Sequence, residues 1–102
     1  MNIKPVEIFQ GNKIEILEIF LKKVNYQLEL SWKINFENVI YRLAFHNVSR
    51  FTLEKLSIPM EVQGLEVINH AQDGWEKDLT YEVRDFEDNR VSFFCEYFEV
   101  RK

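Results

Sequence analysis

An unbroken alternation of apolar and polar residues over residues 26–36 constrains the fold of this chain more than any other feature. The segment has the sequence YQLELSWKINF, in which every second residue is apolar. A period of two matches a β-strand that buries one face and exposes the other to water. Such one-sided strands are typical of antiparallel sheets. The sequence therefore predicts an antiparallel sheet with one face against a core.

A second alternating run, over residues 39–45, follows after only two residues, Glu37 and Asn38. Two alternating runs joined by so short a connection predict a β-hairpin. Asn47 then predicts a bend or a bulge, because asparagine is common in turns. Residues 51–56 are expected to continue in an extended conformation.

The C-terminal part of the chain predicts a second hairpin. Residues 79–84 alternate, the polar segment 85–89 marks a turn, and residues 91–100 return. Phe93 and Phe94 are adjacent and therefore point to opposite faces of a strand. Both faces then need apolar cover, which favours an inner strand of a sandwich or barrel.

Between the hairpins, residues 65–68 predict a short strand. The Asp73-Gly74 dipeptide that follows predicts a turn.

Two segments allow a helix as well as a strand. Residues 14–24 alternate, but they also place Ile16 and Ile19 along one helical face. A strand is favoured there because no convincing helix cap precedes the segment. Residues 91–100 fit a helical stripe as well, so both interpretations stay open at these two places.

The expected fold is all-β: a single domain over residues 1–102, folded as an antiparallel β-sandwich or a partly open barrel of about six to eight strands. The alternative is an α+β fold with one short helix. Aromatic residues make up 15% of the chain, which suits pleated, half-buried surfaces. The predicted core consists of Ile16, Tyr26, Leu28, Leu30, Trp32, Ile34, Phe36, Tyr41, Leu43, Phe45, Val83, Phe93 and Phe94.

Charge is unevenly distributed along the chain, whose formal net charge is −4. Residues 1–60 hold 8 Lys or Arg and 6 Asp or Glu, whereas residues 61–102 hold 5 and 11. The acidic second part argues against a nucleic-acid partner, which requires clustered basic residues. It is compatible with a basic protein partner.

The termini and the cysteine content predict a cytoplasmic protein with no membrane partner. The N-terminus lacks the apolar run of a signal peptide, and no stretch approaches the ~18 apolar residues of a membrane span. The one cysteine, Cys95, cannot form an internal disulfide, as expected of a reducing compartment.

No motif of catalysis, cofactor binding or metal binding is present, so the chain is expected not to be an enzyme and to carry no cofactor. Phosphate-binding loops, dinucleotide fingerprints, H-E-x-x-H and C-x-x-C are all absent. Cys95 lies in an apolar run, where a thiol is usually an inert core residue. His70, Asp73 and Asp78 lack metal-ligand spacing, and a turn with local hydrogen bonds explains them better.

The candidate partner-binding residues are Trp75, Glu82, Asp85, Glu87 and Asp88. Trp75 follows a turn and precedes a charged run, so it is either a lid on the core or an exposed anchor for a partner. The four carboxylates gather around the predicted closing turn, where they would form either a solvated tip or an acidic face for a basic partner.

Basic residues at strand edges guard against unwanted pairing, and Lys55, Arg42 and Arg50 are expected in that role. If these residues do not protect the edges, we expect two copies of the chain to pair through strand edges as a symmetric homodimer.

Four segments together resemble the YxiG-like group of small bacterial (Bacillus-type) proteins. They are GLEVINH at residues 64–70, GWEKD at 74–78, YEVRDFED at 81–88 and VSFFCE at 91–96. Members of that group are similar to small proteins encoded near polymorphic cell-surface toxins, among immunity-like genes. The group has no assigned activity, so the resemblance implies no catalytic residue.

Two hypotheses for function follow. The first is a non-enzymatic protein-binding module, an immunity-like protein that neutralises a basic toxin domain through an acidic face and Trp75. The second is a small-ligand-binding β-barrel whose aromatic side chains line a cavity.

Overall fold

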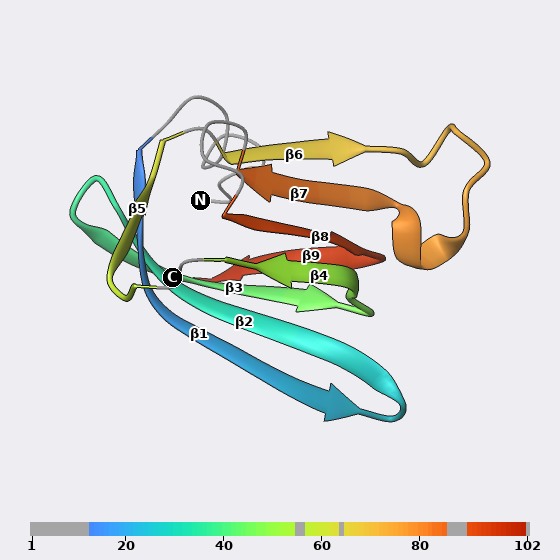
Figure 1. The fold of residues 1–102 in the computed structure, drawn as a ribbon, viewed down its shortest axis with the longest axis horizontal. Helices are drawn as coiled ribbons and strands as arrows, with labels where there is room; N and C mark the ends of the chain where they lie inside the picture. The colour runs from blue at the N-terminus through green and yellow to red at the C-terminus, as the bar shows by residue number, and fades with distance from the viewer. Residues whose placement is uncertain (1–12, 55–56, 64, 86–89, 102) are drawn as a thin grey trace.

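Two antiparallel β-sheets packed face to face make up the fold (Figure 1). The computed structural model describes residues 13–54, 57–63, 65–85 and 90–101. The first sheet contains, in spatial order, β5 (Met60–Val62), β1 (Ile14–Val24), β2 (Gln27–Phe36), β3 (Val39–His46) and β9 (Tyr97–Arg101). The second contains β4 (Ser49–Leu53), β8 (Val91–Cys95), β7 (Tyr81–Asp85) and β6 (Leu65–Asn69). One 3-10 turn, η1 (Lys77–Leu79), precedes β7.

The prediction of an all-β antiparallel sandwich is confirmed, and the sheets do not close into a barrel. The described residues form nine strands, one more than the largest number expected, and contain no α-helix. Residues 14–24 are a strand. The run 91–100 divides at Glu96 into β8 and β9, which belong to different sheets.

Two-residue turns close both hairpins of the first sheet. Asn25 and Tyr26 join β1 to β2 with φ of 50° and 66°, and Glu37 and Asn38 join β2 to β3 with φ of 52° and 64°. Positive φ at both central residues is the type I′ geometry that matches the twist of the flanking strands. The predicted turn at Glu37-Asn38 is confirmed. The prediction that Tyr26 is a core residue is wrong: its side chain is 95% exposed, because the chain reverses there.

A β-bulge in β1 explains why this strand resembles a helix in sequence. The pairing register with β2 shifts between Ile16 and Glu18, so Leu17 is an extra residue. Ile16 therefore faces Ile34 before the bulge, and Ile19 faces Trp32 after it. Two residues three positions apart thus share the inner face of a strand, as they would share one face of a helix.

Edge-to-face aromatic contacts fill the space between the sheets. Trp32 lies 5.0 Å from Phe45 and 5.8 Å from Phe93 between ring centroids, and Phe45 lies 4.8 Å from Phe93. These separations and steep interplanar angles are favourable for aromatic pairs. The aromatic residues expected to line an internal cavity therefore pack against one another.

Most of the predicted core is confirmed, with two residues misplaced and two only partly buried. The buried members are Ile16, Leu30, Trp32, Ile34, Tyr41, Leu43, Phe45, Val83 and Phe93. Leu28 and Phe36 are partly buried. Besides Tyr26, Phe94 is misplaced: it is partly buried on the outer face of β8, since Phe93 points inward. The prediction that β8 is an inner strand is confirmed, because it lies between β4 and β7.

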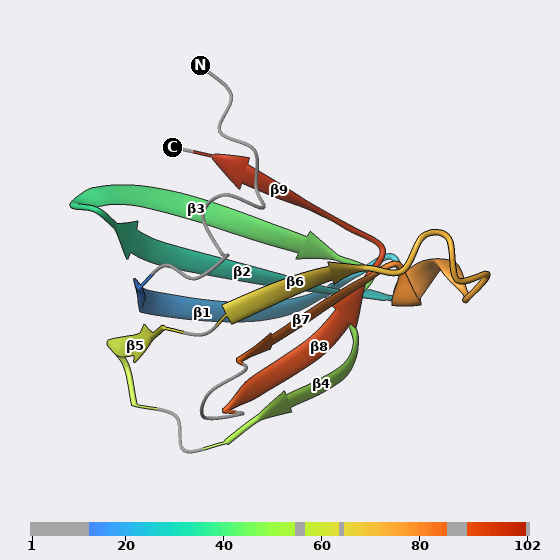
Figure 2. The same cartoon turned by 90° about the horizontal axis from the view of Figure 1, so that it is seen from above.

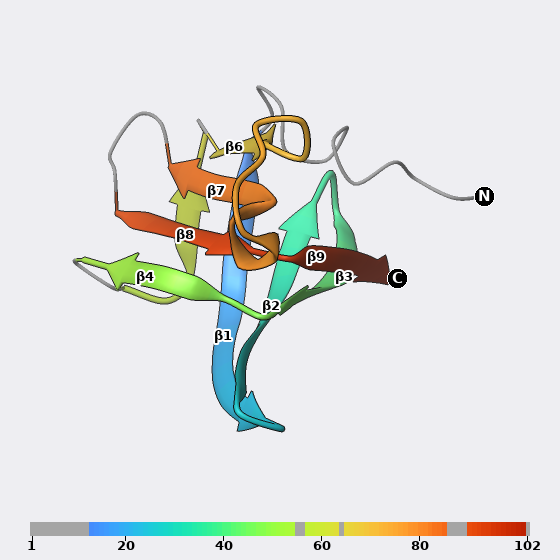
Figure 3. The same ribbon diagram turned by 90° about the vertical axis from the view of Figure 1, so that its right-hand side faces the viewer.

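The chain passes between the sheets twice at one corner. Asn47, with φ 55°, turns the chain from β3 toward β4, which confirms the predicted bend, and Glu96 separates β8 from β9. The Nδ2 of Asn47 donates to Oε1 of Glu96 at 3.1 Å, and the backbone N of Glu96 donates to the carbonyl of His46 at 3.0 Å. The sheets converge toward this end of the molecule (Figure 2). In Figure 3, β1 crosses β7 and β8 steeply, as in an orthogonal sandwich.

One strand edge of the first sheet is only partly covered. β5 pairs with β1 only from Ile14 to Ile16, and among the described residues no strand covers the rest of that edge. Arg42 lies on the inner strand β3, so its expected role as an edge guard is wrong. Arg50 does lie on the edge strand β4, and Lys55 falls outside the described residues. Dimerisation through an edge stays a prediction. No helix in the described part of the chain is long and apolar enough to span a membrane.

Candidate functional site

A cluster of aromatic and charged side chains lies on the outer face of the four-stranded sheet. We call it the Trp75 cluster. It consists of His70, Asp73, Trp75, Glu82 and Phe94. Glu82 on β7 and Phe94 on β8 are cross-strand partners, and the other three residues belong to the loop between β6 and β7. Two predicted partner-binding residues, Trp75 and Glu82, thus belong to one site.

Local hydrogen bonds shape the loop that carries Trp75. The backbone N of His70 donates to the carbonyl of Thr80 at 2.6 Å, which closes the base of the loop. The backbone N of Asp73 donates to the carbonyl of His70 at 2.9 Å, and Gly74 has a φ of 72°. A positive φ suits glycine, which has no Cβ. The predicted turn at Asp73-Gly74 is confirmed, and it places Trp75 over His70.

Both ring nitrogens of His70 contact carboxylates. Nδ1 lies 2.7 Å from Oδ2 of Asp73, and Nε2 lies 3.0 Å from Oε1 of Glu82. A neutral imidazole has only one N–H group, whereas the imidazolium ion has two. Only the protonated ring can therefore donate to both carboxylates. Hydrogen bonds to Glu82 and then to Asp73 raise the pKa of His70 above its ordinary value of 6.5, although desolvation opposes the shift.

The indole of Trp75 is held on one side and exposed on the other. Its ring stacks on the His70 ring at 4.2 Å between centroids and 25° between planes, and it lies 6.3 Å from the Phe94 ring. The side chain is 50% exposed. Trp75 is thus not a lid on the core between the sheets. It is a half-exposed aromatic residue held against the His70 ring.

The remaining predicted residues do not join this cluster. Asp85 is 1% exposed, and its Oδ2 lies 3.4 Å from both the backbone N and Nε of Arg90. Arg90 also donates through Nη2 to the carbonyl of Glu61. The structure places Asp85 in the interior, in a contact that supports the fold, so its carboxylate is not part of an acidic surface. Glu87 and Asp88 fall outside the described residues.

Cys95 lies in the core, as predicted. It is a free, buried cysteine, and desolvation raises the pKa of its thiol to about 12. A thiol that stays protonated is a poor nucleophile. Within the described residues, no group of three or more His, Cys, Asp or Glu side chains is arranged to hold a metal ion.

The fold and this cluster define an antiparallel β-sandwich with a half-exposed tryptophan stacked on a histidine on one outer face. Comparisons of the chain with protein-family models, curated proteins and solved structures gave no match. The similarity to the YxiG-like group stays a prediction.

The central role of His70 was missed in the sequence. Its spacing from Asp73 indicates a local contact within a turn, and that signal was present. The contact with Glu82 depends on β6 returning beside β7, with Asn69 opposite Tyr81. The sequence alone does not determine that register.

We expect His70 to titrate above its ordinary value, because only the protonated ring satisfies both carboxylates. A histidine whose pKa is raised on folding stabilises the native state fully below its unfolded pKa, here pH 6.5. That contribution is lost as the pH rises through the raised pKa. An NMR titration of the ring protons measures the midpoint directly. Glu82→Gln should move the midpoint down, whereas Glu66→Gln, on the same face but paired with Arg84, should leave it in place. A wild-type midpoint at or below 6.5 would refute the double contact.

Proposed function

We propose that this protein is a non-enzymatic protein-binding module that engages a basic partner through the Trp75 cluster. The observation that carries the proposal is the half-exposed indole of Trp75 stacked on His70. Tryptophan side chains dominate the binding energy of many interfaces when they enter a pocket on the partner. A ring that is already held in place loses less conformational entropy on binding than a mobile one.

Charge around the anchor favours a basic partner. Asp73, Glu76 and Asp78 lie on the same loop, whose basic residues are His70 and Lys77. An acidic surface steers a basic protein toward the site. A basic side chain of the partner can also stack over the exposed part of the indole. A toxin domain, which the YxiG-like resemblance implies, is one protein of this class.

The Trp75→Ala variant should bind a basic protein encoded beside this gene at least about 30-fold more weakly than wild type, the loss typical of an interface hot spot. Isothermal titration calorimetry measures the affinity. Tyr97→Ala is the matched control, because Tyr97 is also an aromatic residue, 47% exposed and stacked on a histidine, His46, at 4.4 Å. If both variants lose affinity equally, Trp75 is not a specific anchor for the partner.

The same assay tests the contribution of the acidic segment, by which we mean Glu87 and Asp88 at the predicted closing turn. The Glu87→Lys/Asp88→Lys variant should bind more weakly and with a smaller dependence on salt, because screening acts on charge attraction. Hen lysozyme, a basic protein that is not a partner, should bind weakly to all variants alike. If the charge-reversed variant binds as tightly as wild type, the acidic segment is not part of the interface.

A further inference from the structure

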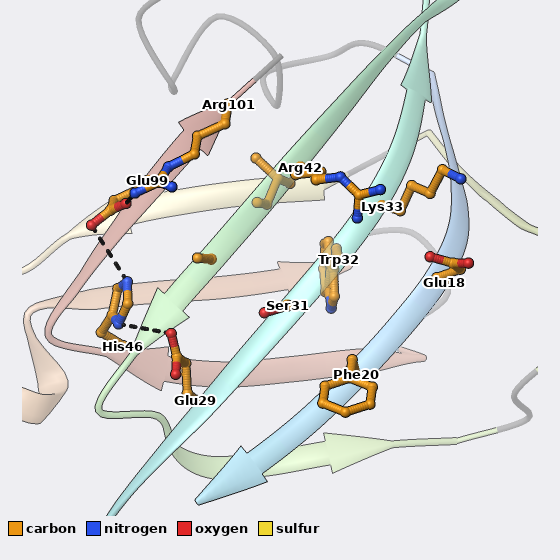
Figure 4. Close-up of a pocket in the computed structure, with 12 residues that line it drawn as sticks. Glu18, Phe20, Glu29, Ser31, Trp32, Lys33, Arg42, His46, Glu99 and Arg101 are labelled. Carbon is orange, nitrogen blue, oxygen red and sulfur yellow. Dashed lines mark hydrogen bonds and ion pairs between the residues drawn. The ribbon is translucent and has the colours of Figure 1, made fainter. Parts of the chain in front are cut away.

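A depression of about 330 Å³ lies on the outer face of the five-stranded sheet (Figure 4). Side chains from β1, β2, β3 and β9 line it. This volume lies at the lower end of the range found for small-molecule sites. The Trp75 cluster lies on the other sheet, so the two features are independent.

The strand register arranges the outer face in three rows of cross-strand partners. The first row is Glu18, Lys33, Arg42 and Arg101. The middle row is Phe20, Ser31, Ala44 and Glu99. In the third row Lys22 is paired with Glu29 and His46 with Tyr97, and Glu29 lies 3.3 Å from His46. The two central residues of the middle row, Ser31 and Ala44, are small while their neighbours are long. The hollow follows from this difference in side-chain size.

Two cationic side chains lie at one end of the hollow. Lys33 and Arg42 are directly opposite in the register of β2 and β3, and in Figure 4 the Arg42 guanidinium lies beside the Lys33 side chain, whose amino group extends toward β1. Like charges in such positions destabilise a sheet. Neither side chain has an ion-pair partner among the described residues, and Glu18, which faces Lys33 in register, makes no ion pair with it.

The carboxylates at the other end have nearby basic side chains. Glu29 lies 3.3 Å from Nδ1 of His46 and 3.7 Å from Nζ of Lys22. Glu99 lies 2.8 Å from Nη2 of Arg101 and 3.6 Å from Nε2 of His46. Glu29 and Glu99 therefore have ion-pair partners, whereas Lys33, Arg42 and the Glu18 carboxylate that faces Lys33 have none among the described residues.

We propose that the depression binds a small organic anion. Its carboxylate or phosphate group lies between Lys33 and Arg42, where the guanidinium offers a planar pair of donors. Its apolar body lies over Ser31 and Ala44 and contacts Phe20, which is 63% exposed at the rim. An anion at this position is attracted to both cationic side chains, and its charge offsets the repulsion between them.

The size and charge of the hollow favour a small molecule over a nucleic acid. A polyanion requires basic residues along an extended surface, whereas two unpaired cations here serve one anionic group. The Glu18 carboxylate, which lines the hollow and faces Lys33 in register, would repel the flanking phosphates of a longer chain.

The test uses the full chain and three probes: phenyl phosphate, benzoate and inorganic phosphate. NMR titration should show shifts of the Ser31 and Ala44 amides, with none at Trp75. Phenyl phosphate or benzoate should bind at least about tenfold more tightly than inorganic phosphate, because the apolar body is buried. The tighter of the two organic probes identifies the anionic group as phosphate or carboxylate.

Variants separate the two halves of the site. Arg42→Gln should weaken phenyl phosphate or benzoate at least about tenfold, whereas Arg50→Gln, a basic residue on the other sheet, should have no effect. Phe20→Ala should reduce the preference for the organic probes over inorganic phosphate. Equal binding of all three probes, unchanged affinity in Arg42→Gln or absence of shifts at Ser31 and Ala44 would each overturn the proposal. The last of these readouts uses wild-type protein and does not depend on any variant folding.

Discussion

The Phe93→Ala variant is expected to lose about 3–5 kcal/mol of unfolding free energy, the usual cost of deleting a buried phenylalanine side chain. Phe93 is fully buried on β8 and contacts three other aromatic rings from both sheets. Those rings are Trp32, Phe45 and Phe51, at 5.8, 4.8 and 6.0 Å. Because the sheets cross steeply, few other residues can fill the space that its ring would leave. A domain of this size has a total stability of roughly 5–15 kcal/mol, so the variant would lose a large fraction of its unfolding free energy.

Urea denaturation followed by circular dichroism measures this loss. Trp32 contacts Phe93, so its fluorescence reports the same transition from within the core. Phe20→Ala removes the same side chain from an exposed position and should change the unfolding free energy by less than about 0.5 kcal/mol. A similar loss of unfolding free energy in both variants would show that packing of Phe93 between the sheets does not contribute more than an exposed phenylalanine.

The alternation of apolar and polar side chains predicts most of this fold, because it determines which face of each strand is buried. Residues 26–36 and 39–45 became β2 and β3, and Trp32 and Phe45 point inward as expected. The prediction failed at Tyr26, where the apolar pattern continues but the chain turns. A tyrosine with positive φ carries no turn signal in a sequence, since only glycine and asparagine are common there.

Passage of a strand from one sheet to the other was not predictable. Residues 91–100 contain no glycine, proline or asparagine that would indicate a turn, yet Glu96 divides them into strands of two sheets. The hydrogen bond of Asn47 with Glu96 joins two residues that are far apart in the sequence. Such a corner depends on long-range pairing, which local patterns do not contain.

The candidate site was predictable in part. Trp75 and Glu82 belong to one cluster, but the residue that links them, His70, depends on the unpredicted register of β6 and β7. Asp85 was predictable from a signal that was overlooked. Val83 points inward, and a period of two places Asp85 on the same buried face.

The two outer faces share one local arrangement. On each, a histidine lies between two carboxylates and stacks on a half-exposed aromatic ring: His46 with Tyr97 on the first sheet, and His70 with Trp75 on the second. The two arrangements differ in the distances between the histidine nitrogens and the carboxylates. The carboxylates of His70 lie at 2.7 and 3.0 Å, whereas those of His46 lie at 3.3 and 3.6 Å. The tighter contacts hold the ring that supports Trp75, which is why Trp75 is the stronger candidate for an anchor.

The Arg90→Met variant should lose about 3 kcal/mol of unfolding free energy, because it removes the cation that faces a buried carboxylate. Asp85 is 1% exposed and Arg90 is 24% exposed. The same substitution removes the hydrogen bond from Arg90 to the carbonyl of Glu61, which ties β7 and β8 of one sheet to β5 of the other. Only the second of these losses acts on a contact between the two sheets, and urea denaturation measures the sum of both.

Two further variants distinguish the cost of an uncompensated buried charge from the cost of losing an ion-pair contact. Lys13→Met breaks an ion pair with Glu61 that is 3.2 Å long and largely exposed, and should cost less than about 1 kcal/mol. The Asp85→Asn/Arg90→Met double variant should be more stable than Arg90→Met alone, because a neutral amide replaces a buried charge. If the double variant is the less stable of the two, Asp85 is held by its remaining partners, and Arg90 is not the group that compensates its charge.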